Sequence, residues 1–291
     1  MCDEHTEHSN QEAFDAGALS RRGFGMMTMA ALAACTTAPP NPADVAGRDV
    51  EIQTADGVMD AYYVAPTAGK YPAVLVWPDI MGLRPAFRLM GDRLAKSGYA
   101  VLTVNPFYRK QKGMVFDATT EKFSDPPVRA RLVPLMQSLS ADTNKVDAVA
   151  AIGWLDKQKE VDTSKGVGTT GYCMGGPLVM RTAAYVPDRV RAGCTFHGGG
   201  IATAQPNSPH LLVPQYKAKA FLCAVAQNDD QQDPASKDRL KEAFSAAGIP
   251  AEVEVYPAQH GWCPPDSQVY DQVQAERAWE RLLATFKVGL S

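Results

Sequence analysis

The sequence predicts a doubly wound α/β fold, in which a mostly parallel sheet of about eight strands carries helices on both faces. From residue 73 onwards, short apolar runs alternate with segments of helical spacing. The run at 73–77 contains no polar residue, as expected for a strand covered on both faces. Hydrophobic residues make up 45% of the chain and charged residues 21%, which is typical of a globular protein with a large core. We therefore expect one domain over residues 43–291, a length within the range of this class.

The first predicted element is an antiparallel hairpin at the edge of the sheet. Residues 50–53 and 58–64 alternate apolar and polar side chains on either side of Ala55-Asp56-Gly57. An Asp-Gly pair between two such runs is a strong hairpin signal.

The remaining elements follow in alternation. Predicted strands lie at 73–77, 99–104, 166–170, 191–196, 220–226 and 251–256, and predicted helices at 85–97, 141–157, 177–185, 235–247 and 267–288. Gly98 and Gly248 are suitable C-caps for the helices that they follow. Between 107 and 140 the periodicity is lost and three prolines occur, so we expect loops and short helices that form a lid.

The segment 171–176, Gly-Tyr-Cys-Met-Gly-Gly, joins a predicted buried strand to a predicted helix. Glycines two residues before and two after Cys173 allow the tight turn that exposes a nucleophile above a sheet, as in G-x-S-x-G with Cys in place of Ser. The amide of Met174 would then lie at a helix N-terminus, where it would face developing negative charge. The alternative is a buried structural cysteine beside a glycine-rich turn.

A nucleophilic thiol requires a base and an acid that orients it. His260 lies in the loop 259–262 after the last predicted strand, and Asp229 and Asp230 follow the strand before it. This order, nucleophile then acid then base, is that of α/β-hydrolase triads. The residues leave both aspartates open as the acid, and we also consider an N-cap or a solvated loop for this pair.

The elbow, the Asp-Asp pair before Pro234 and His260-Gly261-Trp262 resemble the dienelactone hydrolase (carboxymethylenebutenolidase) family of α/β-hydrolases, from about residue 48 to the end. The resemblance implies a carboxylic ester hydrolase that acts on small esters or lactones through a Cys-His-Asp triad and a thioester intermediate. Family members carry the acid four residues before a proline, which favours Asp230 over Asp229.

The resemblance also implies roles for residues around the nucleophile. Asp79 stands where a glutamate usually pairs with the thiol, and the amide of Ile80, with that of Met174, would form the oxyanion hole. Arg109, after Phe107-Tyr108, would bind a substrate carboxylate, and Tyr108 would take part in the same binding. Apart from the resemblance, Trp262 could form an apolar wall of the pocket, and packing in the core is the alternative. A second arginine that family members active on dienelactone carry after the histidine is replaced here by 262–265, Trp-Cys-Pro-Pro.

His197 precedes three glycines after a predicted strand. It could line the pocket, but we favour a structural histidine whose ring nitrogens are hydrogen-bonded.

The N-terminal region 1–42 is not expected to belong to the fold. Arg21-Arg22 before a short apolar run is typical of a Tat export signal, and 32–35, Leu-Ala-Ala-Cys, resembles a bacterial lipobox. We expect cleavage before Cys35, lipid on its sulfur, and a proline-rich tether after it. The predicted location is the periplasm or the envelope; an ordinary soluble periplasmic product and a cytoplasmic protein are the alternatives.

The net charge of −3 gives no indication of a nucleic-acid partner, and we expect membrane association only through the lipid. No metal-ligand spacing and no GxGxxG or Walker motif occurs, so we expect no metal and no organic cofactor. Two other functions remain open: a small-molecule-binding envelope lipoprotein with a degenerate hydrolase fold, and a redox-reactive thiol protein.

Overall fold

The computed structural model describes residues 9–10 and 44–291. The strands form one eight-stranded sheet in the order β1-β2-β4-β3-β5-β6-β7-β8. Its strands are β1 (Val45–Thr54), β2 (Gly57–Pro66), β3 (Ala73–Trp77), β4 (Ala100–Val104), β5 (Val167–Tyr172), β6 (Val190–Phe196), β7 (Ala220–Ala226) and β8 (Ala251–Tyr256). The pairs β1–β2 and β2–β4 are antiparallel and all others are parallel. The predicted mostly parallel sheet is confirmed.

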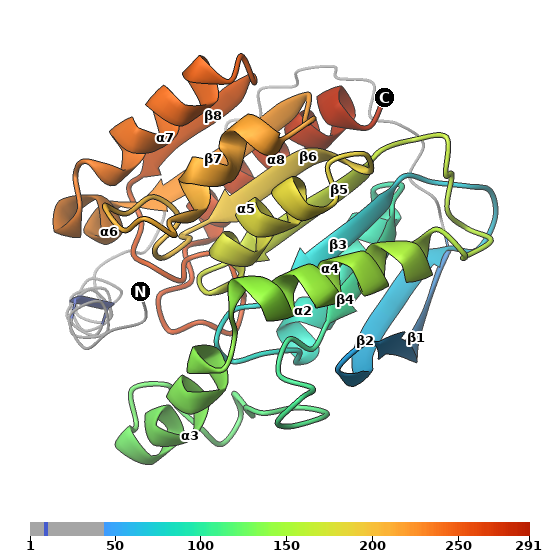
Figure 1. Ribbon diagram of the computed structural model, residues 1–291. Coiled ribbons are helices and arrows are strands. Elements are labelled where there is room, and N and C mark those ends of the chain that lie inside the picture. The colour runs from blue at the N-terminus through green and yellow to red at the C-terminus, as the bar shows by residue number, and fades with distance from the viewer. Residues whose placement is uncertain (1–8, 11–43) are drawn as a thin grey trace, which may run out of the picture.

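Helices cover both faces of this sheet, as Figure 1 shows. One face carries α4 (Ala141–Leu155), α5 (Gly175–Tyr185) and α7 (Ser236–Ala246), and the other carries α2 (Pro85–Lys96) and α8 (Gln272–Gly289). Two separate hydrophobic clusters result, one on each side of the sheet. Strands β3 and β7 are apolar throughout because neither of their faces meets water.

The edge hairpin turns as its sequence predicts. Thr54 pairs with Gly57 across a two-residue turn, and Gly57 has φ +133°, a conformation that favours glycine. Strand β1 begins at Val45, five residues before its predicted start, because the exposed edge residues before Val50 pair with β2 without forming an apolar pattern.

The segment 107–140 contains one regular helix, α3 (Pro126–Gln137), which lies apart from the sheet in Figure 1. Its two leading prolines occupy the first turn, where a missing N–H costs nothing. Apolar residues of this segment, including Phe107, Phe116 and Leu132, pack with Ile80 and Met174 in a third cluster. The excursion therefore lies against the predicted nucleophile turn, as expected for a lid.

The predicted export signal, the lipobox with Cys35 and the tether lie outside the described residues. Over residues 9–10 and 44–291, no helix combines the length and the apolar character that crossing a membrane requires. Two short helical segments complete the fold, α6 (Gln227–Gln232) after β7 and the 3₁₀ helix η1 (Pro209–Gln215).

Candidate active site

Cys173 sits on a sharp turn between β5 and α5. Its φ of +53° lies in the left-handed region, which is unfavourable for a non-glycine residue and is held here by its neighbours. The Cys173 N–H donates to the carbonyl of Phe196 (3.0 Å), and its carbonyl accepts from the N–H of Gly176 (3.0 Å). This is the geometry of a nucleophile elbow, as the glycine pattern predicts.

The elbow glycines are required by close backbone approach. A Cβ on Gly171 would collide with the carbonyl of Gly175, and a Cβ on Gly175 would collide with the carbonyl of Trp77 at the end of β3. These contacts bring the start of α5 against the loop that follows β3.

That loop presents a backbone amide beside the thiol. Asp79 binds the two amides that follow Ile80: its side chain accepts from the N–H of Met81 (2.9 Å), and its carbonyl accepts from the N–H of Gly82 (2.9 Å). The Ile80 amide precedes these two along the chain, and Ile80 lines the same pocket as Cys173. The Met174 amide lies at the N-terminus of α5, directly after Cys173.

His260 is held by the short helix α6. Its Nδ1 lies 2.7 Å and 2.9 Å from the two carboxylate oxygens of Asp229, and its backbone N–H donates to Oδ1 of Asn228 (2.8 Å). One contact orients the ring and the other anchors the loop. The Asn228 contact could not be predicted from the sequence, where its only signal is its position beside Asp229.

The preference for Asp230 as the partner of His260 is wrong. Asp230 pairs instead with Nζ of Lys237 on α7 (2.6 Å). Residues 227–232 form a helix that the sequence analysis does not predict, and successive side chains on a helix point about 100° apart. When Asp229 faces the histidine, Asp230 therefore cannot.

Cys173 and His260 interact through their side chains. Burial is the largest influence on the His260 pKa and lowers it, but the Asp229 carboxylate, the charge of Cys173 and a hydrogen bond to each of these side chains together raise the pKa to about 10. Asp229 and Cys173 thus favour the protonated imidazole, and a protonated imidazole in turn favours the thiolate form of Cys173.

Asp79 lines the pocket, but its carboxylate is bound by Arg84. The guanidinium Nη1 and Nη2 donate to Oδ1 (2.7 Å) and Oδ2 (3.0 Å) of Asp79, and its Nε and Nη2 donate to Asp266 (2.7 and 2.9 Å). The Arg84 side chain has 0% exposure. Burial raises the pKa of Asp79, and Arg84 opposes that rise. An Asp79–Arg84 ion pair therefore lies at the pocket that Cys173 also lines.

Arg109 and Tyr108 do not line the pocket, so their predicted role in substrate binding is wrong. Arg109 donates to Asp56 in the β1–β2 turn (2.7 Å) and to Asp147 on α4 (2.7 Å). The Tyr108 hydroxyl bonds to Thr54 and to Asp147 (2.7 and 2.9 Å). Both acidic partners are distant in sequence, and for that reason the local motif could not reveal this network.

Trp262 also lies outside the pocket. It is fully buried, stacks on Tyr256 with ring centroids 5.2 Å apart, and meets His197 edge to face at 5.0 Å. Trp262 therefore packs against His197, which lines the pocket, and does not itself form a wall of the pocket.

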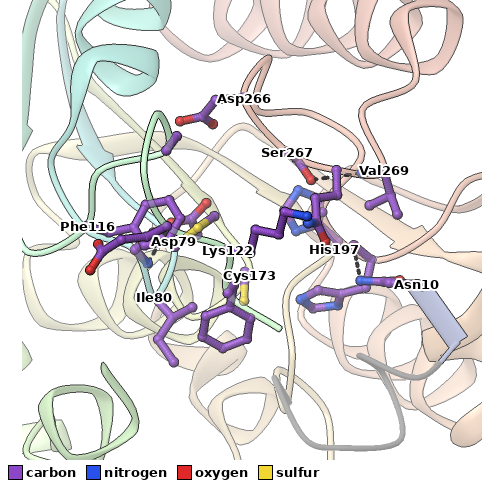
Figure 2. A pocket seen from close by; sticks show the side chains of 17 residues that line it. Asn10, Asp79, Ile80, Phe116, Lys122, Cys173, His197, Asp266, Ser267 and Val269 are labelled. Carbon is purple, nitrogen blue, oxygen red and sulfur yellow. Dashed lines mark hydrogen bonds between the residues drawn. The ribbon is translucent and has the colours of Figure 1, made fainter. Parts of the chain in front are cut away.

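The pocket has a volume of about 330 Å³ and is open to solvent on one side. Figure 2 shows Asp79 and Ile80 on one side of Cys173 and His197 and Ser267 on the other. The apolar lining of the pocket comes from the loop after β3, the lid and the loop after His260: Ile80, Met81, Phe116, Phe123 and Val269. Asn10 also lines it and donates to the carbonyl of His260 (2.8 Å). The space and its polarity suit a small, largely apolar acyl group.

Within the described part of the chain, no group of three or more His, Cys, Asp or Glu side chains is arranged to hold a metal ion. The chemistry available here is that of a thiol, an imidazole, a carboxylate and two backbone amides.

Comparison with known proteins agrees with this geometry. The model of the dienelactone hydrolase family matches residues 59–290. A candidate carboxymethylenebutenolidase of Methylorubrum extorquens is 31% identical over 271 residues, covering 91% of this chain and 88% of its own. One of Escherichia coli K12 is 27% identical, covering 88% and 92%. The crystal structure of a candidate dienelactone hydrolase of Klebsiella pneumoniae superposes with a TM-score of 0.68 at 23% identity, covering 84% of this chain and 99% of that one.

Proposed function

Because the chain belongs to the dienelactone hydrolase family and is a hydrolase of that type, we propose that it cleaves small esters or lactones with Cys173 as nucleophile, His260 as base and Asp229 as the orienting acid. The observation that carries this proposal is the contact chain from Cys173 through His260 to Asp229, residues that follow the parallel strands β5, β8 and β7.

In the proposed acylation step, the Cys173 sulfur attacks the ester carbonyl and the carbonyl oxygen becomes an oxyanion. The amides of Met174 and Ile80 bind this oxyanion, and a donor of this kind typically lowers the barrier by about 3 kcal/mol. His260 gives its proton to the leaving oxygen, so that an alcohol departs and a thioester remains. Asp229 keeps the imidazole in the required tautomer throughout.

The test measures hydrolysis of short p-nitrophenyl esters by the full chain and by two cysteine variants. Cys173→Ala should abolish turnover, and a quenched reaction of the wild type should show an acyl group on Cys173 by mass spectrometry. Cys263→Ala removes another buried thiol near the His260 loop and should retain activity. Full activity of Cys173→Ala would refute the proposal.

The same experiment addresses the other two functions. A binding lipoprotein predicts no turnover by any variant, and a redox thiol predicts oxidation of Cys173 without ester hydrolysis. The contacts from the Cys173 thiol through His260 to the Asp229 carboxylate favour the hydrolase over the binding protein and the redox thiol, because neither of these functions requires all three groups in contact.

We also propose that the chain is exported by the Tat route and carries lipid on Cys35. The arginine pair and the apolar run before Cys35 support this location. Incorporation of a labelled fatty acid in a bacterial host, lost in Cys35→Ala, tests it. Processing at this site would also remove Asn10 from the pocket mouth.

A further inference from the structure

His197 follows β6 directly and is the second histidine of the pocket. Its φ is +41°, in the left-handed region, and its backbone N–H donates to the carbonyl of Ala224 (2.8 Å). The glycine after it packs on the start of α5, where a Cβ on Gly176 would collide with Cα of Gly198. The strained backbone is therefore held in place from both sides.

The ring of His197 is fixed by the side chains that surround it. It lies between Trp262 and His260, with centroid distances of 5.0 and 5.1 Å, and is completely buried. Neither ring nitrogen finds a partner among the described residues. A structural histidine would have its nitrogens paired, so our expectation of a hydrogen-bonded structural role is wrong.

His197 thus has two unfavourable features: a strained backbone, and a buried ring whose nitrogens have no hydrogen-bond partner in the described part of the chain. Such costs persist mainly where function requires them. Burial and the neighbouring His260 hold the pKa of His197 well below its ordinary value, so the ring stays neutral and keeps one nitrogen that accepts a hydrogen bond.

Resting on the proposed function, we propose that His197 binds the water molecule that hydrolyses the thioester. One O–H of this water donates to the accepting nitrogen of His197, and the other points to the His260 nitrogen that does not face Asp229. The water oxygen attacks the thioester carbon, its proton passes to His260, and the carbon–sulfur bond breaks. A carboxylic acid leaves, and Cys173 returns as the thiolate beside protonated His260.

The position of the two histidines supports this role. Deacylation needs a water near His260 on the pocket side, and His197 is the other imidazole that lines the described pocket. Asp79 and Ile80 lie across Cys173 from His197, on the side proposed for the oxyanion (Figure 2). A water that attacks from the His197 side therefore does not displace the thioester carbonyl oxygen from the oxyanion hole.

The test compares His197→Phe and His197→Gln in the full chain with a p-nitrophenyl ester. His197→Phe keeps the shape of the ring and removes both nitrogens. We expect the rate of acylation to change less than threefold, the steady-state rate to fall at least tenfold, and acyl-Cys173 to accumulate in quenched samples. His197→Gln, whose amide oxygen can accept a hydrogen bond, should restore part of the steady-state rate.

His210→Phe is the matched control. His210 is also buried, but its Nδ1 is paired with Ser208 Oγ (2.8 Å) and it does not line the pocket. We expect His210→Phe to lower the melting temperature and leave acyl-Cys173 at the wild-type level, whereas His197→Phe should not lower the melting temperature, because an unpaired polar ring is lost.

Three results would overturn the proposal: equal losses in acylation and steady-state rate, an unchanged steady-state rate, or a lower melting temperature that accounts for the lost activity. Failure of the proposed function is distinct, because Cys173→Ala would then remain active or the wild type would form no acyl-enzyme.

Discussion

The Nδ1 atom of His260 lies 2.7 Å from Oδ2 of Asp229, and the side chain of the next residue, Asp230, lies against Lys237. Two adjacent aspartates thus have separate environments, one against the histidine ring and one in an ion pair between helices. The pair provides a controlled comparison within one turn of helix.

Asp229→Asn should reduce kcat/KM on the order of 10³-fold, because the imidazole loses the carboxylate that fixes its tautomer and stabilises its charge. Asp230→Asn should retain activity within about twofold, since it alters only a partly exposed ion pair. Steady-state kinetics of the two variants are the measurement. A greater loss for Asp230→Asn would contradict the assignment.

The charge of His260 makes stability depend on pH. Its pKa is about 10 in the folded protein and near 6.5 when unfolded, so its contribution is complete below about pH 6.5 and is lost as the pH rises toward 10. Urea unfolding of the wild type and His260→Gln should show a stability difference that shrinks from pH 6.5 to pH 10. A constant difference would show that the proton is not held.

His210→Gln provides the control for that titration. Burial lowers the pKa of His210, so this residue is neutral across the same range and its variant should show no such pH dependence. If both variants behave alike, the effect does not come from the His260 site.

Arg84→Met should destabilise the fold by about 3–5 kcal/mol, because Asp79 and Asp266 would lose the buried cation between them. Lys217→Met removes an ion pair with Asp188 whose side chains are 57% and 80% exposed, and should cause little measurable change. Urea unfolding of both variants tests the comparison. Equal effects would show that the buried clamp contributes no more than a surface pair.

Gly171→Ala should destabilise the fold by at least about 2 kcal/mol, since its Cβ would collide with the backbone of Gly175 and the elbow cannot yield. Gly153 lies on the exposed side of α4 with no atom within 4 Å of an added Cβ. Gly153→Ala should therefore stabilise the protein by about 0.5–1 kcal/mol. The measurement is the free energy of unfolding of each variant relative to the wild type. A Gly171→Ala variant as stable as the wild type would contradict the packing argument.

Much of the fold could be predicted because its signals are local. The apolar runs at 73–77 and 220–226 correspond to β3 and β7 without error, since fully buried strands need no polar side chain. The final helix was predicted to begin at 267 and begins at Gln272, because the loop after His260 continues to Asp271, which caps the helix through the amide of Gln274.

The sequence predicted that Cys173 and His260 come together at one site, but not the ion pairs around them. Cys173 and His260 stand in motifs whose glycines and neighbours determine the backbone around them. Arg109 lies in an equally recognisable motif, yet its guanidinium donates hydrogen bonds to Asp56 and Asp147, which belong to two other parts of the chain. A local motif does not specify which distant carboxylate a cation will meet.

The sequence by itself determined the order of the candidate site loops along the chain, the turn that presents Cys173 and the place of His260. These features could be predicted because hydrophobic periodicity and glycine geometry act over a few residues. Only the tertiary structure decided that Asp229 faces His260, that Arg84 pairs with Asp79, and that the ring nitrogens of His197 have no hydrogen-bond partner within residues 9–10 and 44–291. The physical reason is that hydrogen bonds and ion pairs depend on where side chains from separate elements meet, to within about 0.5 Å.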